Sequence, residues 1–260
     1  MKTYQKVIIA IVVLGLCVLT FISKQEKPKT ITLPPVQTTI SDTNEFYVIE
    51  AHIPIEPRDK DNVMSKTMTD IVNARKEEWK IGGALYSEEK GTDKQYPDRP
   101  AMKYELGINY EKFVSKGKDT ITYVFKNYQF TGGAHGGTGL KTYTFDAKGL
   151  VYIQNVLDLN RKNSIALTRI LESKLKSQLG EMYNEQMLPE GLGLAYIKDD
   201  GSFDKTKSDG FDFISNFEHF IILDDGIRFI FGQYQVAPYA AGMPEVVVSF
   251  EELAPYLRSN

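Results

Sequence analysis

Residues 46–80 read FYVIEAHIPIEPRDKDNVMSKTMTDIVNARKEEWK and contain both kinds of secondary structure that the fold needs. The first part, Phe46–Ile55, is rich in aromatic and β-branched residues and predicts a strand that ends before Pro57. From Asn62 to Lys80 the apolar residues recur at helical spacing, which predicts an amphipathic helix. Asn62 is the expected N-cap, and Gly82-Gly83 is expected to end the helix.

The rest of the chain repeats this mixture of strands and helices. A second amphipathic helix is predicted over 164–180, capped by Asn163 or Ser164 and ended by Gly180. Further strands are predicted over the ranges 103–114, 119–130, 140–146, 150–153, 217–223, 227–231 and 246–250, with Asp224-Asp225-Gly226 as a hairpin turn. The expected class is α+β, arranged as two related helix-on-antiparallel-sheet units in tandem.

The tandem arrangement is supported by a weak internal likeness. Tyr128-Gln129 and Tyr234-Gln235 each precede a turn of small residues, and each turn leads into another strand. A duplicated α+β unit explains this likeness, and so does coincidence. We expect an N-terminal unit over 42–147 and a C-terminal unit over 148–260.

The N-terminus has the layout of a segment that directs export. Val7–Ile22 contains no charged residue and follows Lys2 and Lys6. Residues 1–23 are therefore predicted to be a signal peptide or an N-terminal membrane anchor, and 24–41 a Pro/Thr-rich linker. An uncleaved anchor is favoured over a cleaved signal because no small-x-small pair follows the apolar run. Both alternatives place the folded part outside the cytoplasm.

Composition excludes several classes of protein. With 31 basic and 34 acidic residues the net charge is −3, which gives no support for a nucleic-acid partner, because such a partner requires a basic face. A single cysteine cannot form an internal disulfide. It lies in the apolar N-terminal run, so the predicted folded part has no thiol.

The sequence offers no recognisable catalytic or metal-binding motif. His52, His135 and His219 are far apart, and no HExxH, CxxC, G-x-S-x-G or phosphate-binding glycine loop is present. We therefore expect no catalytic residues, no metal and no cofactor. An enzyme that uses His135 with carboxylates brought in by the fold is kept as an alternative.

Two turns are candidates for binding. The turn TGGAHGGTG, 131–139, contains Gly132, Gly133, His135 and Gly136, and its glycines allow the backbone to approach a ligand closely. The turn APYAAGMP, 237–244, is stiffened by its prolines and presents Tyr239, which is also a candidate for a half-buried structural residue.

Trp79 is a further aromatic candidate for a glycan-stacking surface. Its position on the apolar stripe of the first helix instead predicts burial.

A family resemblance emerges from these residues. The Gly-Gly-Ala-His-Gly turn, the lead-in Val156-Leu-Asp-Leu159 to the second helix, and the string Ala237-Pro-Tyr-Ala-Ala-Gly242 resemble the RsiV-like and PdaC-like extracytoplasmic domain family. The resemblance covers about residues 42–257, with a PdaC-like unit followed by an RsiV-like unit.

The resemblance implies an exported α+β binding domain without catalysis of its own. In RsiV such a domain binds lysozyme, and in PdaC-like proteins it precedes a separate deacetylase domain. Only Met1–Lys6 precede the apolar run, so an anti-sigma segment is not expected, and no deacetylase metal set is present. The leading hypothesis is a non-catalytic cell-envelope protein that binds lysozyme or another wall-associated protein. The alternatives are a peptidoglycan- or glycan-binding module and an accessory protein of a wall hydrolase or deacetylase.

Overall fold

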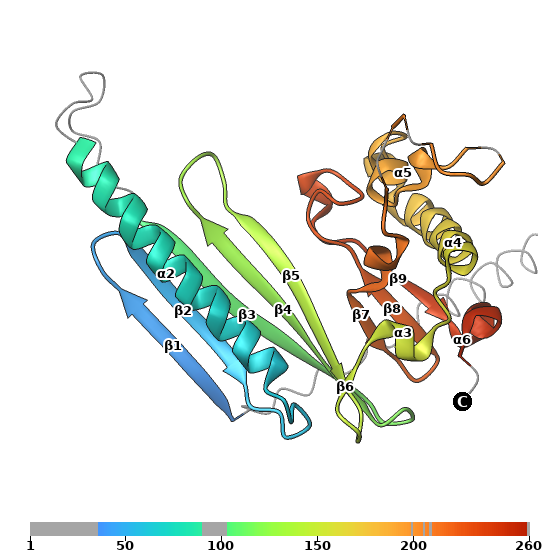
Figure 1. Ribbon diagram of the computed structural model, residues 1–260, viewed down its shortest axis with the longest axis horizontal. Coiled ribbons are helices and arrows are strands. Elements are labelled where there is room, and N and C mark those ends of the chain that lie inside the picture. Colours follow the sequence, from blue (N-terminus) through green and yellow to red (C-terminus); the bar gives the residue numbers. More distant parts are fainter. Residues whose placement is uncertain (1–35, 90–102, 199, 205, 208–209, 259–260) are drawn as a thin grey trace, which may run out of the picture. The chain divides into compact units, whose positions relative to one another are not determined.

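The computed structural model describes residues 36–89 and 103–258, except 199, 205, 208 and 209, and leaves the side chains of 84–89 undescribed. The predicted signal peptide or anchor, 1–23, and most of the predicted linker lie outside these ranges. Within them, no helix is long and apolar enough to cross a membrane. The predicted α+β class is confirmed (Figure 1).

A six-stranded sheet forms the first part of the fold. Its strands follow one another in chain order: β1 (Gln37–Thr43), β2 (Tyr47–Pro54), β3 (Tyr104–Ser115), β4 (Thr120–Phe130), β5 (Gly137–Phe145) and β6 (Leu150–Val151). Neighbouring strands are antiparallel except β2 and β3, which are parallel, so the expected purely antiparallel sheet needs correction. The helix α2 (Val63–Glu89) joins β2 to β3, and a helical crossover of this kind returns the chain in the same direction.

Strand β1 corrects the predicted linker boundary. Residues 37–41 were expected in the linker 24–41, whereas they pair with β2 in a register that joins Thr39 to His52 and Ile40 to Ala51. Ile40 packs against the core of the first sheet. The apolar side chain and its β-branched neighbours thus favour a strand, despite the polar surroundings.

Helix α2 begins and ends differently from the prediction. Its first N–H groups, on Val63, Met64 and Ser65, donate to the carboxylate of Asp59, so Asp59 does the capping that was expected of Asn62. The helix also continues through Gly82-Gly83 to Glu89. A Cβ at position 83 would overlap the ring of Phe46, so Gly83 permits close packing there instead of ending the helix.

Helix α2 lies along one face of the sheet (Figure 1). The core between them contains Trp79, which is 2% exposed, as predicted from its place on the apolar stripe. Trp79 packs on Tyr47 and Tyr104, with ring centroids 6.2 and 5.6 Å apart. Its burial removes it as a glycan-stacking surface.

A three-stranded antiparallel sheet forms the second part together with the helix α4 (Arg161–Leu179). Its strands are β7 (Phe220–Ile222), β8 (Gly226–Ile230) and β9 (Glu245–Ser249). Asn160 caps α4 by accepting from Asn163 N–H, and Gly180 ends the helix with φ 52°. The N-cap was expected at Asn163 or Ser164, whereas the C-terminal glycine was predicted. The other helices of this part are short: α3 (Ile153–Val156), α5 (Met187–Gly191) and α6 (Phe250–Leu253), and the 3-10 helices η1 (Gly180–Met182), η2 (Leu194–Tyr196), η3 (Phe213–Phe217), η4 (Tyr239–Ala241) and η5 (Ala254–Tyr256).

The two sheets are joined by an apolar cluster and by hydrogen bonds. Val124 and Leu140 of the large sheet pack with Ile221 and Ile230 of the small one. Thr142 on β5 donates its hydroxyl to Glu218 O at 3.2 Å and accepts from Phe220 N–H at 3.3 Å. These contacts hold β7 against β5.

A second joint lies at the turn before β4. The carboxylate of Asp224 accepts from the Ser115 hydroxyl at 2.6 Å and from Gly117 N–H at 2.9 Å. The β3–β4 turn is thereby fixed to the β7–β8 hairpin.

Candidate functional site

The two turns that the sequence singled out meet in space. His135, in the turn after β4, stacks on Tyr239, in the turn before β9, with ring centroids 4.4 Å apart and planes at 29°. His135 Nδ1 also lies 2.9 Å from Gly136 O. His135 is exposed and Tyr239 is 39% exposed, so the stacked pair lies at the surface.

Two more tyrosines extend this pair. Tyr234 lies 5.6 Å from Tyr239 between ring centroids and is 51% exposed. Tyr128, at the end of β4, is 40% exposed and covers Gly136. We call the four residues Tyr128, His135, Tyr234 and Tyr239 the aromatic cluster.

The glycines of the turn 131–139 have two different structural roles. A Cβ at Gly136 would lie 2.5 Å from the Tyr128 ring and 2.6 Å from Gln129 O, so only glycine fits this contact. Gly132 and Gly133 have φ angles of 93° and 102°, with open space around them. Their glycine identity serves the bend of the turn, because other residues rarely adopt such angles.

Tyr234 has a left-handed backbone, with φ 61°. This conformation costs a residue other than glycine roughly 1–2 kcal/mol. The surrounding turn is fixed by Gln235, whose side-chain oxygen accepts from Gly232 N–H at 3.0 Å, while Gln235 N–H donates to Gly232 O at 3.1 Å. Strained residues of this kind are often found where a side chain contacts a ligand.

Gln233 links this turn to the large sheet. Its side-chain Oε1 accepts from Thr138 N–H at 2.8 Å, which connects the turn to the start of β5. The bond brings residues 95 positions apart together beside the aromatic cluster. This backbone-to-amide bond joins the two segments of the cluster, in addition to the stack of His135 on Tyr239.

A groove of about 300 Å³ adjoins the cluster through Thr138 and Gln233. Its floor is apolar and its rim carries charged and amide groups. It is lined by Glu111, Phe113, Val124, Lys126, Thr138, Ile230, Gln233, Met243 and Glu245. Concave apolar surfaces with a few polar groups are the usual form of small-ligand sites.

The charged residues of the rim are held in ion pairs. Lys126 lies 2.6 Å from Glu111, and Arg228 lies 3.2 Å from Glu245. The second oxygen of each carboxylate is left to accept from a ligand, since no described residue bonds to it.

The described residues include no group of three or more histidine, cysteine or acidic side chains that could hold a metal ion. His135 forms no hydrogen bond or ion pair with a carboxylate in the described ranges. His52 bonds to Gln37 and Glu50, away from the cluster. Burial, followed by nearby Lys141, lowers the pKa of His219 to about 4. The three histidines do not converge on one site.

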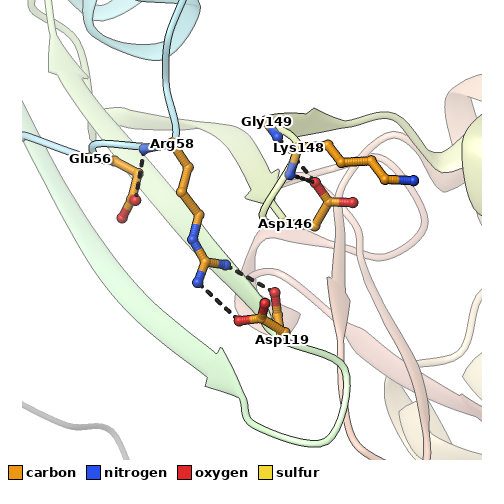
Figure 2. Close-up of polar contacts among 6 residues, drawn as sticks. All are labelled: Glu56, Arg58, Asp119, Asp146, Lys148 and Gly149. Atoms are coloured by element: carbon orange, nitrogen blue, oxygen red, sulfur yellow. Dashed lines mark hydrogen bonds and ion pairs between the residues drawn. The ribbon is translucent and has the colours of Figure 1, made fainter.

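A second group of polar residues lies at the end of the large sheet where β4 begins and β5 ends, opposite the β4–β5 turn. Figure 2 shows these residues. We call Glu56, Arg58, Asp119 and Asp146 the polar corner. Arg58 donates to the carbonyl and the carboxylate of Asp119, both at 2.9 Å. Asp146 accepts from the backbone N–H groups of Lys148 and Gly149.

Glu56 is the buried member of the polar corner, at 8% exposure. Its carboxylate accepts from Arg58 N–H at 3.1 Å and from the Tyr123 hydroxyl at 2.8 Å. Burial and, after it, this bond to Glu56 raise the pKa of the Tyr123 phenol well above its usual value. Each carboxylate of the corner is therefore bonded within the protein, which fits a structural role.

Three residues of the site were not singled out from the sequence. Nothing in the composition of the sequence distinguishes these residues from other tyrosines and glutamines. The exposure of Tyr128, the backbone angle of Tyr234 and the hydrogen bond of Gln233 are set by the tertiary fold. The repeated Tyr-Gln pair before each turn was the signal that could have found the two tyrosines.

Two family models match successive parts of the chain. The family described as "Deacetylase PdaC" matches residues 40–138, and the family described as "Protein of unknown function (DUF3298)" matches 155–251. The chain is also 26% identical over 175 residues to the peptidoglycan-N-acetylmuramic acid deacetylase PdaC of Bacillus subtilis. That match covers 66% of this chain and 33% of the relative, so the chain spans about a third of the relative's length.

Two solved structures have the same fold. A DUF3298-family protein from Bacteroides fragilis is 18% identical, with a TM-score of 0.57, over 89% of this chain and 96% of its own. A DUF3298-family protein from Pseudomonas aeruginosa is 14% identical, with a TM-score of 0.52, over 88% and 96%. The expected resemblance to a PdaC-like domain family is confirmed by the family models and the relative.

Proposed function

We propose that this protein is a non-catalytic binding module of the cell envelope and that its aromatic cluster binds the glycan strand of peptidoglycan. The observation that supports it most is the exposed stack of His135 on Tyr239, extended by Tyr234 and Tyr128. Flat aromatic rings with a polar edge offer an apolar face to a sugar ring and a hydrogen bond at the margin.

The relative supports the choice of ligand, because its name gives peptidoglycan N-acetylmuramic acid as its substrate. The match covers a third of that enzyme, so we assign binding and not deacetylation to the shared region. An extracytoplasmic location, with the apolar segment 7–22 as anchor or signal, is part of the same proposal.

The direct test is co-sedimentation of the purified full chain with insoluble peptidoglycan. We expect the wild-type protein in the pellet, and most of His135→Ala and Tyr239→Ala in the supernatant. Tyr152→Ala is the matched control, because Tyr152 is 58% exposed and is not part of the cluster. A wild-type protein that stays in the supernatant would sink the glycan proposal.

Lysozyme is the second candidate ligand. Glu111 and Glu245 at the groove rim, about 45% and 43% exposed, offer carboxylates to a basic protein surface, and tyrosines are enriched in protein interfaces. Titration of the full chain with a lysozyme distinguishes the two ligands. Binding to lysozyme that weakens in salt, without binding to peptidoglycan, would favour the protein partner.

A further inference from the structure

We propose that the groove beside the aromatic cluster recognises the acetamido group of an N-acetylated sugar. The inference rests on the proposed function, since it takes the aromatic cluster as the surface for the sugar ring. It adds a chemical preference that stacking alone does not supply, because every sugar has an apolar face.

An acetamido group needs three things from a site: an apolar surface for its methyl, a donor for its carbonyl and an acceptor for its N–H. The groove floor, formed by Phe113, Val124, Ile230 and Met243, provides the apolar surface. At about 300 Å³ the groove is at the small end of the range for small-molecule sites, roughly 300–1,000 Å³. A groove of this size admits one sugar residue together with its acetamido substituent.

The donor is the side-chain amide of Gln233. Its Oε1 accepts from Thr138 N–H at 2.8 Å, which fixes the orientation of the amide. Its Nε2 has no acceptor among the described residues, so both of its hydrogens are available to a ligand carbonyl. Lys126 at the rim is a second donor, although it is also paired with Glu111.

The acceptors are the rim carboxylates. Glu245 uses one oxygen for Arg228, and Glu111 uses one for Lys126. The remaining oxygens can accept from the acetamido N–H. Donor, acceptor and apolar floor thus surround one groove that is continuous with the cluster through Thr138 and Gln233.

Three β-1,4-linked trisaccharides test this preference, because they differ at C2 alone. They are chitotriose with acetamido groups, its de-N-acetylated form with amines, and cellotriose with hydroxyls. Calorimetric titration of the full chain should give chitotriose an affinity about tenfold above that of cellotriose, the effect of two modest hydrogen bonds.

Two variants locate the preference in the groove. Gln233→Glu keeps the acceptor for Thr138 N–H but removes the amide donor, so the ratio of the chitotriose to the cellotriose affinity should fall to about three, the effect of the one remaining hydrogen bond. Gln235→Glu is the matched control, because it adds the same charge in the same turn, can still accept from Gly232 N–H and does not line the groove. The control should keep the tenfold ratio. A ratio is measured on one sample, so partial unfolding does not imitate the result.

Each other outcome has a defined meaning. Equal affinity for chitotriose and cellotriose would overturn the acetamido preference and leave the glycan function standing. Tighter binding of the amine form would show that the rim carboxylates select positive charge, and it would also overturn the inference. Absence of binding by all three sugars would overturn the proposed function and the inference together.

Discussion

The polar corner and the aromatic cluster lie at opposite ends of the large sheet and are built in opposite ways. In the corner, every carboxylate accepts hydrogen bonds from its own chain, and Glu56 is buried. In the cluster, aromatic rings are exposed, Tyr234 has a strained backbone, and the amide nitrogen of Gln233 has no acceptor among the described residues. Satisfied polar groups stabilise a fold, whereas exposed and unsatisfied ones leave interactions for a ligand.

The largest expected effect is on stability, in the corner. Glu56→Ala leaves the Tyr123 hydroxyl and the Arg58 N–H without their acceptor, which should lower the free energy of unfolding by about 1–3 kcal/mol. Urea denaturation measures the loss. Peptidoglycan binding at 10 °C below the variant's melting temperature should equal that of the wild type, and a binding defect there would contradict the division of roles.

The next effect is on binding, in the cluster. Tyr239→Ala removes the ring that His135 stacks on, and we expect a loss of affinity of about 30-fold, the size typical of a central aromatic residue. The free energy of unfolding should change by less than about 0.5 kcal/mol, because the residue is exposed. A large loss of stability would mean that Tyr239 belongs with the structural residues.

A third variant should change stability and binding in opposite directions. Tyr234→Gly relieves the left-handed strain of about 1–2 kcal/mol but adds the backbone entropy of glycine, so a net gain in stability of about 0.5–1 kcal/mol is expected. The same change deletes an exposed ring and should weaken binding. Thermal unfolding and co-sedimentation, run on one preparation, measure both. A variant that is less stable than the wild type would show that the contacts of the Tyr234 ring stabilise the fold by more than the backbone strain destabilises it.

The smallest effect concerns how stability depends on pH at the contact of Asp224 with Ser115 and Gly117, which joins the two sheets. The Ser115 hydroxyl and, after it, the Gly117 N–H hold the pKa of Asp224 below its usual value. A carboxyl whose pKa is lower in the folded state stabilises the fold above its unfolded pKa of about 3.8, and this contribution disappears as the pH falls through the folded value. Asp224→Asn should therefore be less stable than the wild type at pH 7, with a smaller difference at pH 3. If the stability difference between the wild type and Asp224→Asn is the same at pH 7 and pH 3, ionisation of the Asp224 carboxyl does not stabilise the fold.

Most of the fold was predictable because it depends on local periodicity. The strands around Tyr47–Pro54 and Thr120–Phe130, the second helix and the Asp224-Asp225-Gly226 hairpin all follow from spacing and turn chemistry. The errors have tertiary causes. Gly83 does not end its helix because Phe46 packs there, and residues 37–41 form a strand because β2 offers them a partner.

The site was predictable in its parts but not in its assembly. The glycine turn and the turn of Tyr239 could be selected from the sequence because each has an unusual composition. The glycines and prolines are needed for the local backbone conformation of these turns. Their contact depends on how the two sheets pack, and Tyr234 depends on a backbone angle that the hydrogen bonds of Gln233 and Gln235 impose. Neither the contact between the turns nor the backbone angle of Tyr234 can be read from a short stretch of sequence. The boundary between residues 147 and 148 and the internal duplication stay predictions, whereas the linker boundary at 41 is corrected by β1.

The bond between Thr138 and Gln233 has a consequence for the order of events during synthesis. The chain emerges from its N-terminus, so the last strand of the large sheet, which ends at Val151, is synthesised 83 residues before Tyr234. A nascent or truncated chain that ends before Gln233 therefore contains only the first half of the proposed binding surface. Binding competence would then report that translation has run to completion, and any change in one turn during evolution would be constrained by its distant counterpart.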